Sequence, residues 1–311
     1  MQVARGLKRG DVLEYSLKQL RSGLSLAIVA NIIWGVAALF WVETRPVDPV
    51  DVVAHRAIWT LPIATVFLLF ARRLRSTWSL IRVGSTFLWS LLAAGLLSVN
   101  WGVFVYAVTA GRATEASLGY FMLPLLTIVV GRVVFHEALG VTQRVAIGLA
   151  IVAVLVQVFS YGSLPWISLA VSSSFGFYGA IRKKISADTI QGLFIETLCM
   201  FPFALAWFWV TGGAGMGIYG WKVDMFLILS GVYTAAPLLT YIAAARLLPL
   251  SVVGYTSYLG PSLQLLVAQT VLGESIDAVT AVSFGLVWLG VLLVSGRGLL
   301  QIRRRKMGGG T

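Results

Sequence analysis

An uncharged run at residues 23–42 decides the fold, and it reads GLSLAIVANIIWGVAALFWV. Because a helix rises 1.5 Å per residue, about 20 apolar residues cross the hydrocarbon core of a bilayer. Residues 145–158, VAIGLAIVAVLVQV, form another such run. Only 12% of the 311 residues are charged and 58% are hydrophobic, whereas soluble domains carry about a quarter charged residues. The sequence therefore predicts a helical membrane protein.

Apolar segments recur along the whole chain between clusters of charged and turn-forming residues. We expect ten spans, at about 22–42, 51–71, 86–109, 114–134, 142–160, 164–181, 192–211, 223–245, 251–271 and 278–297. The longest segment outside them is the N-terminal stretch of about 21 residues. The predicted fold class is therefore all-α integral membrane with ten transmembrane helices and no separate soluble domain.

The basic residues are distributed unevenly between the two sides of this topology. With the N-terminus inside, 20 Lys and Arg residues fall on the cytoplasmic side, within 1–21, 72–82, 132–144, 182–184, 246 and 297–306. The outward segments hold only Arg45, Arg112 and Lys222. This split follows the positive-inside rule and predicts that both termini are cytoplasmic. The net charge of +12 is thus explained by topology, and we expect no nucleic-acid partner.

The sequence also repeats itself at a fixed offset of 137 residues. Pro124 is followed thirteen residues later by Glu137, and Pro261 is followed thirteen residues later by Glu274. The repeat predicts two five-helix units, residues 22–160 and 161–297. Because five is odd, the second unit crosses the membrane in the opposite sense, which makes the repeats inverted.

Basic segments flank the two repeats, at residues 1–21 and 298–311. In the first, Val12, Leu13, Leu17 and Leu20 fall near one face of a helix, which favours an interfacial helix; a frayed tail is the alternative. The first apolar run is about 20 residues long and lacks a small-residue cleavage pattern after it. We therefore expect the first span to be retained and not removed as a signal peptide.

Inverted repeats are typical of secondary transporters, in which the substrate site lies near the midplane between the repeats. The sequence has no Walker motif, which favours facilitated or ion-coupled movement over ATP-driven movement. Such repeats also occur in channels and scramblases. A lipid scramblase is the main alternative and would need a polar groove open to the bilayer; an enzyme or structural subunit would need a catalytic cluster or an apolar docking face.

Several local motifs resemble a known family in their order and spacing. They are His55-Arg56 before Ile58-Trp59, Asn100-Trp101, EASLGYFMLPL from Glu115 to Leu125, FYGAIRKKI from Phe177 to Ile185, and Ile195 to Thr197. Together they resemble the EamA-type drug/metabolite transporter superfamily and, within it, the RarD subfamily, over nearly all of residues 22–297. The long basic N-terminal segment departs from the compact pattern of that family.

The resemblance implies a ten-helix, inverted-repeat carrier in a bacterial inner membrane, with both termini cytoplasmic. It also implies a central cavity lined by the first four helices of each repeat. The resemblance does not imply one substrate, since the superfamily moves amino acids, drugs, nucleotide sugars and other metabolites. We expect a small organic metabolite or drug, amino-acid-like or amphipathic, as the substrate and the lipid bilayer as the other partner.

Three ionisable residues lie well inside predicted spans, where charge is costly: Arg56, Glu115 and Glu196. The repeat superposes Arg56 on Glu196, but the inversion separates them by roughly 15–20 Å in depth. We expect Arg56 to approach Glu115, with His55 adjacent, either as an outer gate or substrate anchor or as a helix-locking ion pair. For Glu196 we expect a partner among Arg182, Lys183 and Lys184; a lock and a proton site are both open, so protons are a candidate partner.

Aromatic and amide side chains supply further candidates within the spans. The candidate substrate-binding or gating residues are Trp34, His55, Arg56, Asn100, Trp101, Tyr106, Glu115, Tyr120, Tyr178, Arg182, Glu196, Tyr258 and Gln264, with Tyr255 in the same aromatic group. Tryptophans at predicted span ends, Trp41, Trp166, Trp209 and Trp221, fit an interfacial belt. Asn100 is also explained by a bond across helices.

Two stripes of small and polar residues occupy one face of the fourth and ninth spans. They are Ser117, Tyr120, Pro124, Thr127 and Gly131, and Gly254, Ser257, Pro261, Gln264 and Ala268. Such a stripe is typical of a packing seam, while the mid-span prolines favour a cavity lining.

Signals for enzymatic chemistry are weak. His55 and His136 fall on opposite sides of the membrane in this topology, and Cys199 is the only cysteine. We therefore expect no metal, no cofactor and no enzymatic activity.

Overall fold

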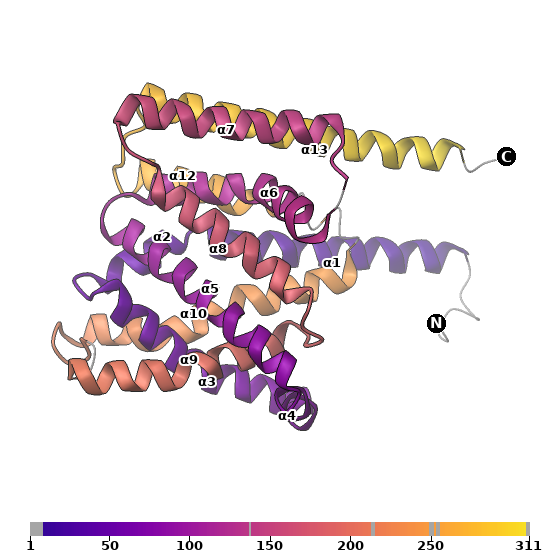
Figure 1. The fold of residues 1–311 in the computed structure, drawn as a ribbon. Helices are drawn as coiled ribbons and strands as arrows, with labels where there is room; N and C mark the ends of the chain where they lie inside the picture. The colour runs from indigo at the N-terminus through magenta and orange to yellow at the C-terminus, as the bar shows by residue number, and fades with distance from the viewer. Residues whose placement is uncertain (1–8, 137, 213–214, 249–251, 253–255, 309–311) are drawn as a thin grey trace.

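A computed structural model describes residues 9–136, 138–212, 215–248, 252 and 256–308 (Figure 1). Every regular element in this part of the chain is a helix. The elements are α1 (Arg9–Gly35), α2 (Ala37–Trp41), the 3₁₀ turn η2 (Val42–Thr44), α3 (Pro49–Phe70), α4 (Leu74–Ile81), α5 (Gly84–Thr109), α6 (Ala113–Phe135), α7 (Val141–Tyr161), α8 (Trp166–Arg182), α9 (Thr189–Thr211), α10 (Trp221–Leu247), α12 (Leu259–Thr270) and α13 (Ala278–Gly308).

Local sequence signals set several of these helix boundaries. The Asp48 side chain accepts a hydrogen bond from the backbone of Val50, and Pro49 follows it as the first residue of α3. Asp188 caps α9 in the same way. Gly162 and Gly212 adopt left-handed backbone conformations after α7 and α9, which glycine does readily.

Within the described residues, seven helices are long and apolar enough to cross a membrane. The pair Gln19–Gly35 and Ala37–Thr44, bent by 41°, makes an eighth if it is one span. The predicted spans 164–181 and 251–271 correspond to α8, of 17 residues, and α12, of 12 residues, and the predicted positions Gly254 and Tyr255 lie outside the described residues, as does Glu137. The structure thus confirms an all-helical, multi-pass membrane protein, while the count of ten spans stays a prediction.

Both ends of the described chain are helical. α1 runs from Arg9 into the first span without a break, and α13 continues to Gly308. Residues 9–21 are helical and continuous with the first predicted span, and the cytoplasmic, interfacial placement of residues 1–21 stays a prediction. The start of α1 and the end of α13 project from the same side of the molecule (Figure 1).

The two halves of the chain pack into each other. α1 packs against α10 and α12, and α8 packs correspondingly against α5 and α6. α3 packs against α9 and α10, and α5 packs against α9. α7 and α13 lie side by side along one edge (Figure 1). Helices of the first half therefore find most of their partners in the second half.

Glycines allow the closest of these helix contacts. A Cβ atom added to Gly231 of α10 would lie 2.3 Å from the backbone of Trp59 in α3, and one added to Gly119 of α6 would lie 2.7 Å from the carbonyl oxygen of Ser168 in α8. Small residues at such crossings let helix backbones approach in a membrane, where packing drives helix association.

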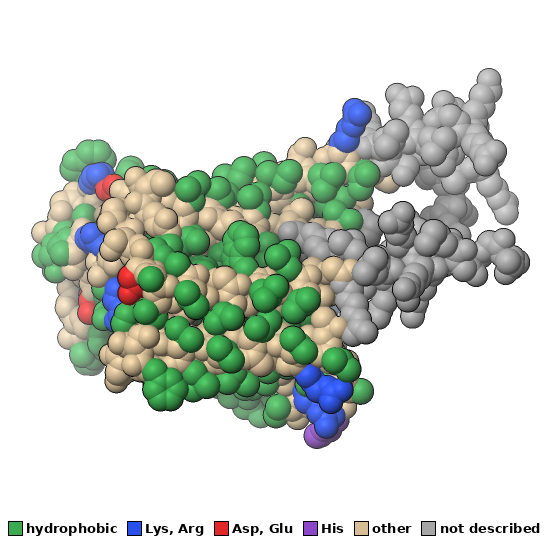
Figure 2. All heavy atoms as spheres, turned by 90° about the horizontal axis from the view of Figure 1, so that it is seen from above, with side chains coloured by type: hydrophobic (Ala, Val, Ile, Leu, Met, Phe, Trp, Pro, Cys, Tyr) green, Lys and Arg blue, Asp and Glu red, His purple; other side chains and the backbone are tan. Residues whose placement is uncertain are grey.

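The outer surface is apolar along most of its length. On the face in Figure 2, charged side chains gather toward the two ends of the molecule and hydrophobic side chains cover the region between them. Trp166, Trp209 and Trp221 are exposed near helix ends, as the belt interpretation predicts. That interpretation is wrong for Trp41, which is only 1% exposed because α2 turns it into the core.

Candidate functional site

The guanidinium group of Arg56 lies between aromatic rings in the interior. Its central carbon is 3.8 Å from the ring centroid of Trp101 and 4.7 Å from that of Trp41. Arg56 Nε donates a 2.7 Å hydrogen bond to Thr234 Oγ1 of α10. Aromatic faces attract cations through the negative side of the ring quadrupole, so α2, α3, α5 and α10 together hold this positive charge.

The predicted contact between Arg56 and Glu115 is wrong. Glu115 is paired with Arg112, whose Nε lies 2.5 Å from Glu115 Oε1 and whose Nη2 lies 2.9 Å from Oε2. The two residues are three apart around the start of α6, a spacing that favours side-chain pairing, and the bond to Glu115 raises the pKa of Arg112. Among the described residues no carboxylate lies within 4.0 Å of Arg56.

Asn100 joins three helices of the same interior. Its amide nitrogen donates to the carbonyl oxygen of Val171 at 3.0 Å and to Ser174 Oγ at 3.2 Å, both on α8. Its amide oxygen accepts a 3.1 Å hydrogen bond from the hydroxyl of Tyr120 on α6. Asn100 is 2% exposed, and the predicted bond across helices is confirmed.

A matching group lies between α1, α10 and α12. Gln264 Nε2 donates a 3.1 Å hydrogen bond to the backbone oxygen of Trp34, and the Trp34 ring lies 5.5 Å from that of Tyr241. The buried Gln264 Oε1 has no hydrogen-bond partner in the described part of the chain. Ser117 Oγ donates to the backbone oxygen of Pro261 at 2.9 Å, so the two small-residue stripes meet where α6 packs on α12, as a packing seam predicts.

Glu196 forms a buried ion pair near the end of α8. Its Oε1 lies 3.3 Å from Arg182 Nη1, and the exposed fractions of the two side chains are 1% and 16%. Tyr178 donates to Glu196 Oε2 at 3.1 Å, while Arg182 Nη2 reaches the backbone oxygens of Ala187 and Asp188. The predicted pairing of Glu196 with Arg182 is therefore confirmed, and both partners belong to the adjacent helices α8 and α9.

Three other candidates lie away from the Arg56 group. His55 is fully buried with its ring 4.5 Å from that of Phe208 on α9, because consecutive helical residues point in different directions. Tyr106 is 38% exposed at the end of α5 and packs on Trp166. Tyr258 packs beside the hydrophobic cluster formed by α6, α7 and α13.

Glu274 links the second half of the chain to the start of α6. Its two carboxylate oxygens accept hydrogen bonds from the backbone nitrogens of Ala113 and Thr114, at 2.6 and 2.7 Å. No side chain at the N-cap position of α6 performs this role, and a negative charge is favourable at a helix N-terminus. Glu274, which the sequence repeat singled out, lies in the second half of the chain and thus caps α6 of the first half.

Sequence reasoning missed Thr234, Trp41 and Tyr233 at the centre. Tyr233 stacks on Phe40 at 4.3 Å, and its hydroxyl donates to the backbone oxygen of Ile33. Trp41 was predicted at the interface because it falls near a span end. Trp41 lies beside Arg56 on α2, beyond the 41° bend that follows α1, while Thr234 contacts Arg56 from α10; no sequence motif predicts either contact.

The side chains around Arg56 are suited to binding a ligand. The centre presents a cation, aromatic faces, an amide and hydroxyl groups. Within the described residues there is no group of three or more His, Cys, Asp or Glu side chains that could hold a metal ion.

Comparison with known proteins gives a consistent family. The EamA-like transporter family model matches residues 21–159. An uncharacterized transporter of Vibrio cholerae is 36% identical over 90% of this chain and 93% of its own, and the RarD protein of Escherichia coli K12 is 36% identical over 89% and 94%. A chloramphenicol-sensitive RarD protein of Pseudomonas aeruginosa is 30% identical over 87% and 92%.

A solved crystal structure supports the fold alone. It superposes with a TM-score of 0.56 at 14% identity, covering 88% of this chain and 96% of the other. The sequence relatives carry the assignment: the chain belongs to the RarD subfamily of the EamA-like transporters, a bacterial family of multi-pass membrane transporters.

Proposed function

We propose that this protein is a secondary carrier that moves a small organic metabolite bearing a carboxylate across the bacterial inner membrane. The carrier has ten spans in two inverted repeats, with both termini cytoplasmic, and works by alternating access. Arg56 is the substrate anchor in this proposal, and Trp101 and Trp41 contact the apolar part of the substrate.

The single observation that carries the proposal is the charge of Arg56. Arg56 is partly buried inside the helix bundle, where a charge normally pairs with an opposite charge, but the described residues that contact its guanidinium group are a hydroxyl and two aromatic rings. The guanidinium fork matches the geometry of a carboxylate, which it binds with two parallel hydrogen bonds. Nε is engaged by Thr234, so the two terminal nitrogens are available for a bound anion.

The packing of the two halves supports alternating access. α1 lies on α10 and α12, while α8 lies on α5 and α6, and these are corresponding sets of helices in the two predicted repeats. Such an arrangement suits rocking of one half against the other around a central site. The described start of α1 and the end of α13 lie on the same side of the molecule (Figure 1). This placement supports an even number of membrane crossings.

The scramblase alternative needs a polar groove that faces lipid. The groove that the described residues form between α3, α5 and α9 is apolar, whereas Asn100, Gln264 and Arg56 face other helices. A lipid headgroup would find no polar path in that groove, so the carrier is favoured.

Purified protein in liposomes tests the proposal. We expect flux of labelled amino acids but much slower flux of the corresponding amides, which lack the carboxylate, and of cationic drugs. Runs with and without a proton gradient show whether protons are coupled to the movement. Movement of fluorescent lipid without any solute flux would overturn the proposal in favour of the scramblase.

Variants then assign the role of Arg56. Arg56→Gln removes the charge and is expected to lower flux at least tenfold, about 1.4 kcal/mol of lost binding, while Arg56→Lys keeps the charge without the planar fork and is expected to lose less. Arg75→Gln, at an exposed position in α4, is the matched control. Equal flux of amino acids and amides in the wild type, or full flux in Arg56→Gln, would refute the anchor.

A further inference from the structure

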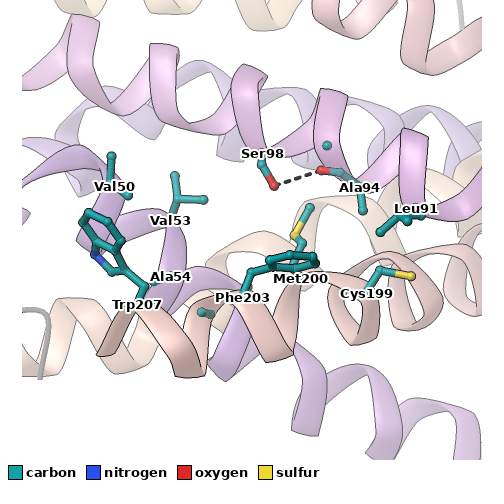
Figure 3. A pocket seen from close by; sticks show the side chains of 13 residues that line it. Val50, Val53, Ala54, Leu91, Ala94, Ser98, Cys199, Met200, Phe203 and Trp207 are labelled. Atoms are coloured by element: carbon teal, nitrogen blue, oxygen red, sulfur yellow. Dashed lines mark hydrogen bonds between the residues drawn. The ribbon is translucent and has the colours of Figure 1, made fainter. Parts of the chain in front are cut away.

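A groove lies on the side of the bundle between α3, α5 and α9 (Figure 3). Its volume is about 410 Å³. Val53 and Ala57 line it from α3, Leu91 and Gly95 from α5, and Met200 and Phe203 from α9. All three helices are candidate membrane spans, so the groove lies at the depth of the hydrocarbon.

The polar side chains that line the groove are Ser98, Trp207 and Cys199, and the Cys199 thiol behaves as a small hydrophobic group. Ser98 Oγ is bonded to the backbone oxygen of Ala94 in its own helix, at 2.9 Å (Figure 3). The indole nitrogen of Trp207 donates to Asp51 Oδ1 at 2.6 Å. Since the Ser98 hydroxyl and the Trp207 indole nitrogen are both hydrogen-bonded within the protein, a polar ligand would find no hydrogen-bond partner here. An alkyl chain needs none and can bind without an unsatisfied polar group.

The groove is open to the bilayer. At its rim Phe203 is 68% exposed and Val50 is 52% exposed. Along α3 the lining extends from Val50 to Ala57, which is roughly 10 Å at 1.5 Å per residue. A cleft of this length in the hydrocarbon is filled by the molecules around it, which are lipid tails.

The end of the groove carries a charge that selects among lipids. Asp51, held by Trp207, and Asp48, which caps α3, lie where Val50 begins the lining. Neither carboxylate forms an ion pair within 4.0 Å with another described residue. A headgroup amine complements this negative end, while an anionic headgroup without an amine is repelled by it.

We propose that the groove between α3, α5 and α9 binds one acyl chain of a phospholipid whose headgroup carries a primary amine, with that amine at Asp51. The site is separate from the Arg56 centre, and it holds a resident lipid and not a transported substrate. Its occupancy is measured without transport, so it stands or falls independently of the proposed carrier function.

Filling the groove tests the acyl-chain site. A Cβ atom at Gly95 meets nothing within 4 Å, so the first carbon of a Gly95→Leu side chain enters the groove without a clash and the rest of the side chain occupies groove volume. Gly285 in α13 is equally open, and Gly285→Leu is the matched control. Protein from mixed micelles containing equal amounts of phosphatidylethanolamine and phosphatidylglycerol is analysed by native mass spectrometry, and the bound lipids are counted.

The expected result is one retained phosphatidylethanolamine in the wild type and in Gly285→Leu, with roughly tenfold less retention in Gly95→Leu. Asp51→Asn preserves the acceptor for Trp207 but removes the charge, and is expected to retain both lipids equally. Thermal unfolding confirms that each variant is folded. Unchanged retention in folded Gly95→Leu would overturn the groove as the site, and an unchanged headgroup preference in Asp51→Asn would overturn the role of the carboxylate.

Discussion

The buried pair of Glu196 and Arg182 gives an asymmetric prediction for stability. Among the described residues, Arg182→Met leaves the Glu196 carboxylate, which is 1% exposed, with the Tyr178 hydroxyl as its one remaining hydrogen-bond partner, and removing one member of a buried pair costs about 3–5 kcal/mol. Glu196→Gln keeps an acceptor for Tyr178 and leaves Arg182 bonded to two backbone oxygens. Because the hydrogen bonds from Arg182 to these two oxygens remain, we expect Glu196→Gln to lower the free energy of unfolding by only about 1–2 kcal/mol.

The double variant separates the pair from its parts. Arg182→Met with Glu196→Gln contains neither buried charge, so it should be more stable than Arg182→Met alone by about 1–3 kcal/mol. The free energy of unfolding is measured by reversible unfolding in mixed micelles containing sodium dodecyl sulfate.

Arg73→Met is the matched control for that cycle. Its partner is Asp188 at the same end of the bundle, but the two side chains are 49% and 32% exposed. We therefore expect Arg73→Met to lower the free energy of unfolding by no more than about 1 kcal/mol. A double variant as unstable as the sum of the single ones would refute the reasoning. Solute flux through folded Glu196→Gln distinguishes the two roles of the pair. Normal transport would show that the pair fixes α8 against α9, whereas loss of proton coupling would show that Glu196 takes part in proton transfer.

Three further predictions concern other contacts. Glu274→Ala should destabilise the protein by about 2–3 kcal/mol and Glu274→Gln by less, because the amide keeps one acceptor for the start of α6; equal unfolding midpoints for wild type and Glu274→Ala would refute the cap. Gly231→Ala should lower the unfolding temperature and solute flux together, since the new methyl group meets the backbone of α3, and Gly285→Ala should do neither. The hydrogen bond from Tyr161 lowers the pKa of Asp277, so its stabilising effect is present above the ordinary carboxyl pKa near 4 and fades as pH falls below it; the difference in unfolding temperature between wild type and Tyr161→Phe should shrink over that range, and a difference that grows there would contradict this.

Hydropathy and spacing predicted much of this architecture. Apolar runs are long because the bilayer demands it, so helices such as α3 and α7 fall within a few residues of the predicted spans. The pairing of Glu196 with Arg182 was also predictable, because the two residues were placed at the same depth on adjacent helices and the interior demands a partner for each charge.

The surroundings of Arg56 were not predictable in the same way. Their similar predicted depth in the membrane suggested that Glu115 is within reach of Arg56. Arg112, however, lies three residues from Glu115 in the sequence and pairs with it without any tertiary contact. A cation between aromatic rings has no fixed spacing along the chain. The contact with Trp41 depends on the 41° bend after α1, which arises from packing.

The packing of α1 on α10 and α12 has a consequence for biogenesis. α1 leaves the ribosome early, while α10 begins at Trp221 and α12 at Leu259, so the first helix has to wait in the bilayer until most of the chain has been synthesised. Its interior face, with Asn31 and Trp34, meets lipid or the insertion machinery during that time. Substitutions on this face should therefore reduce the yield of inserted protein more than equivalent substitutions in α13, whose partner α7 is already in the membrane when it arrives.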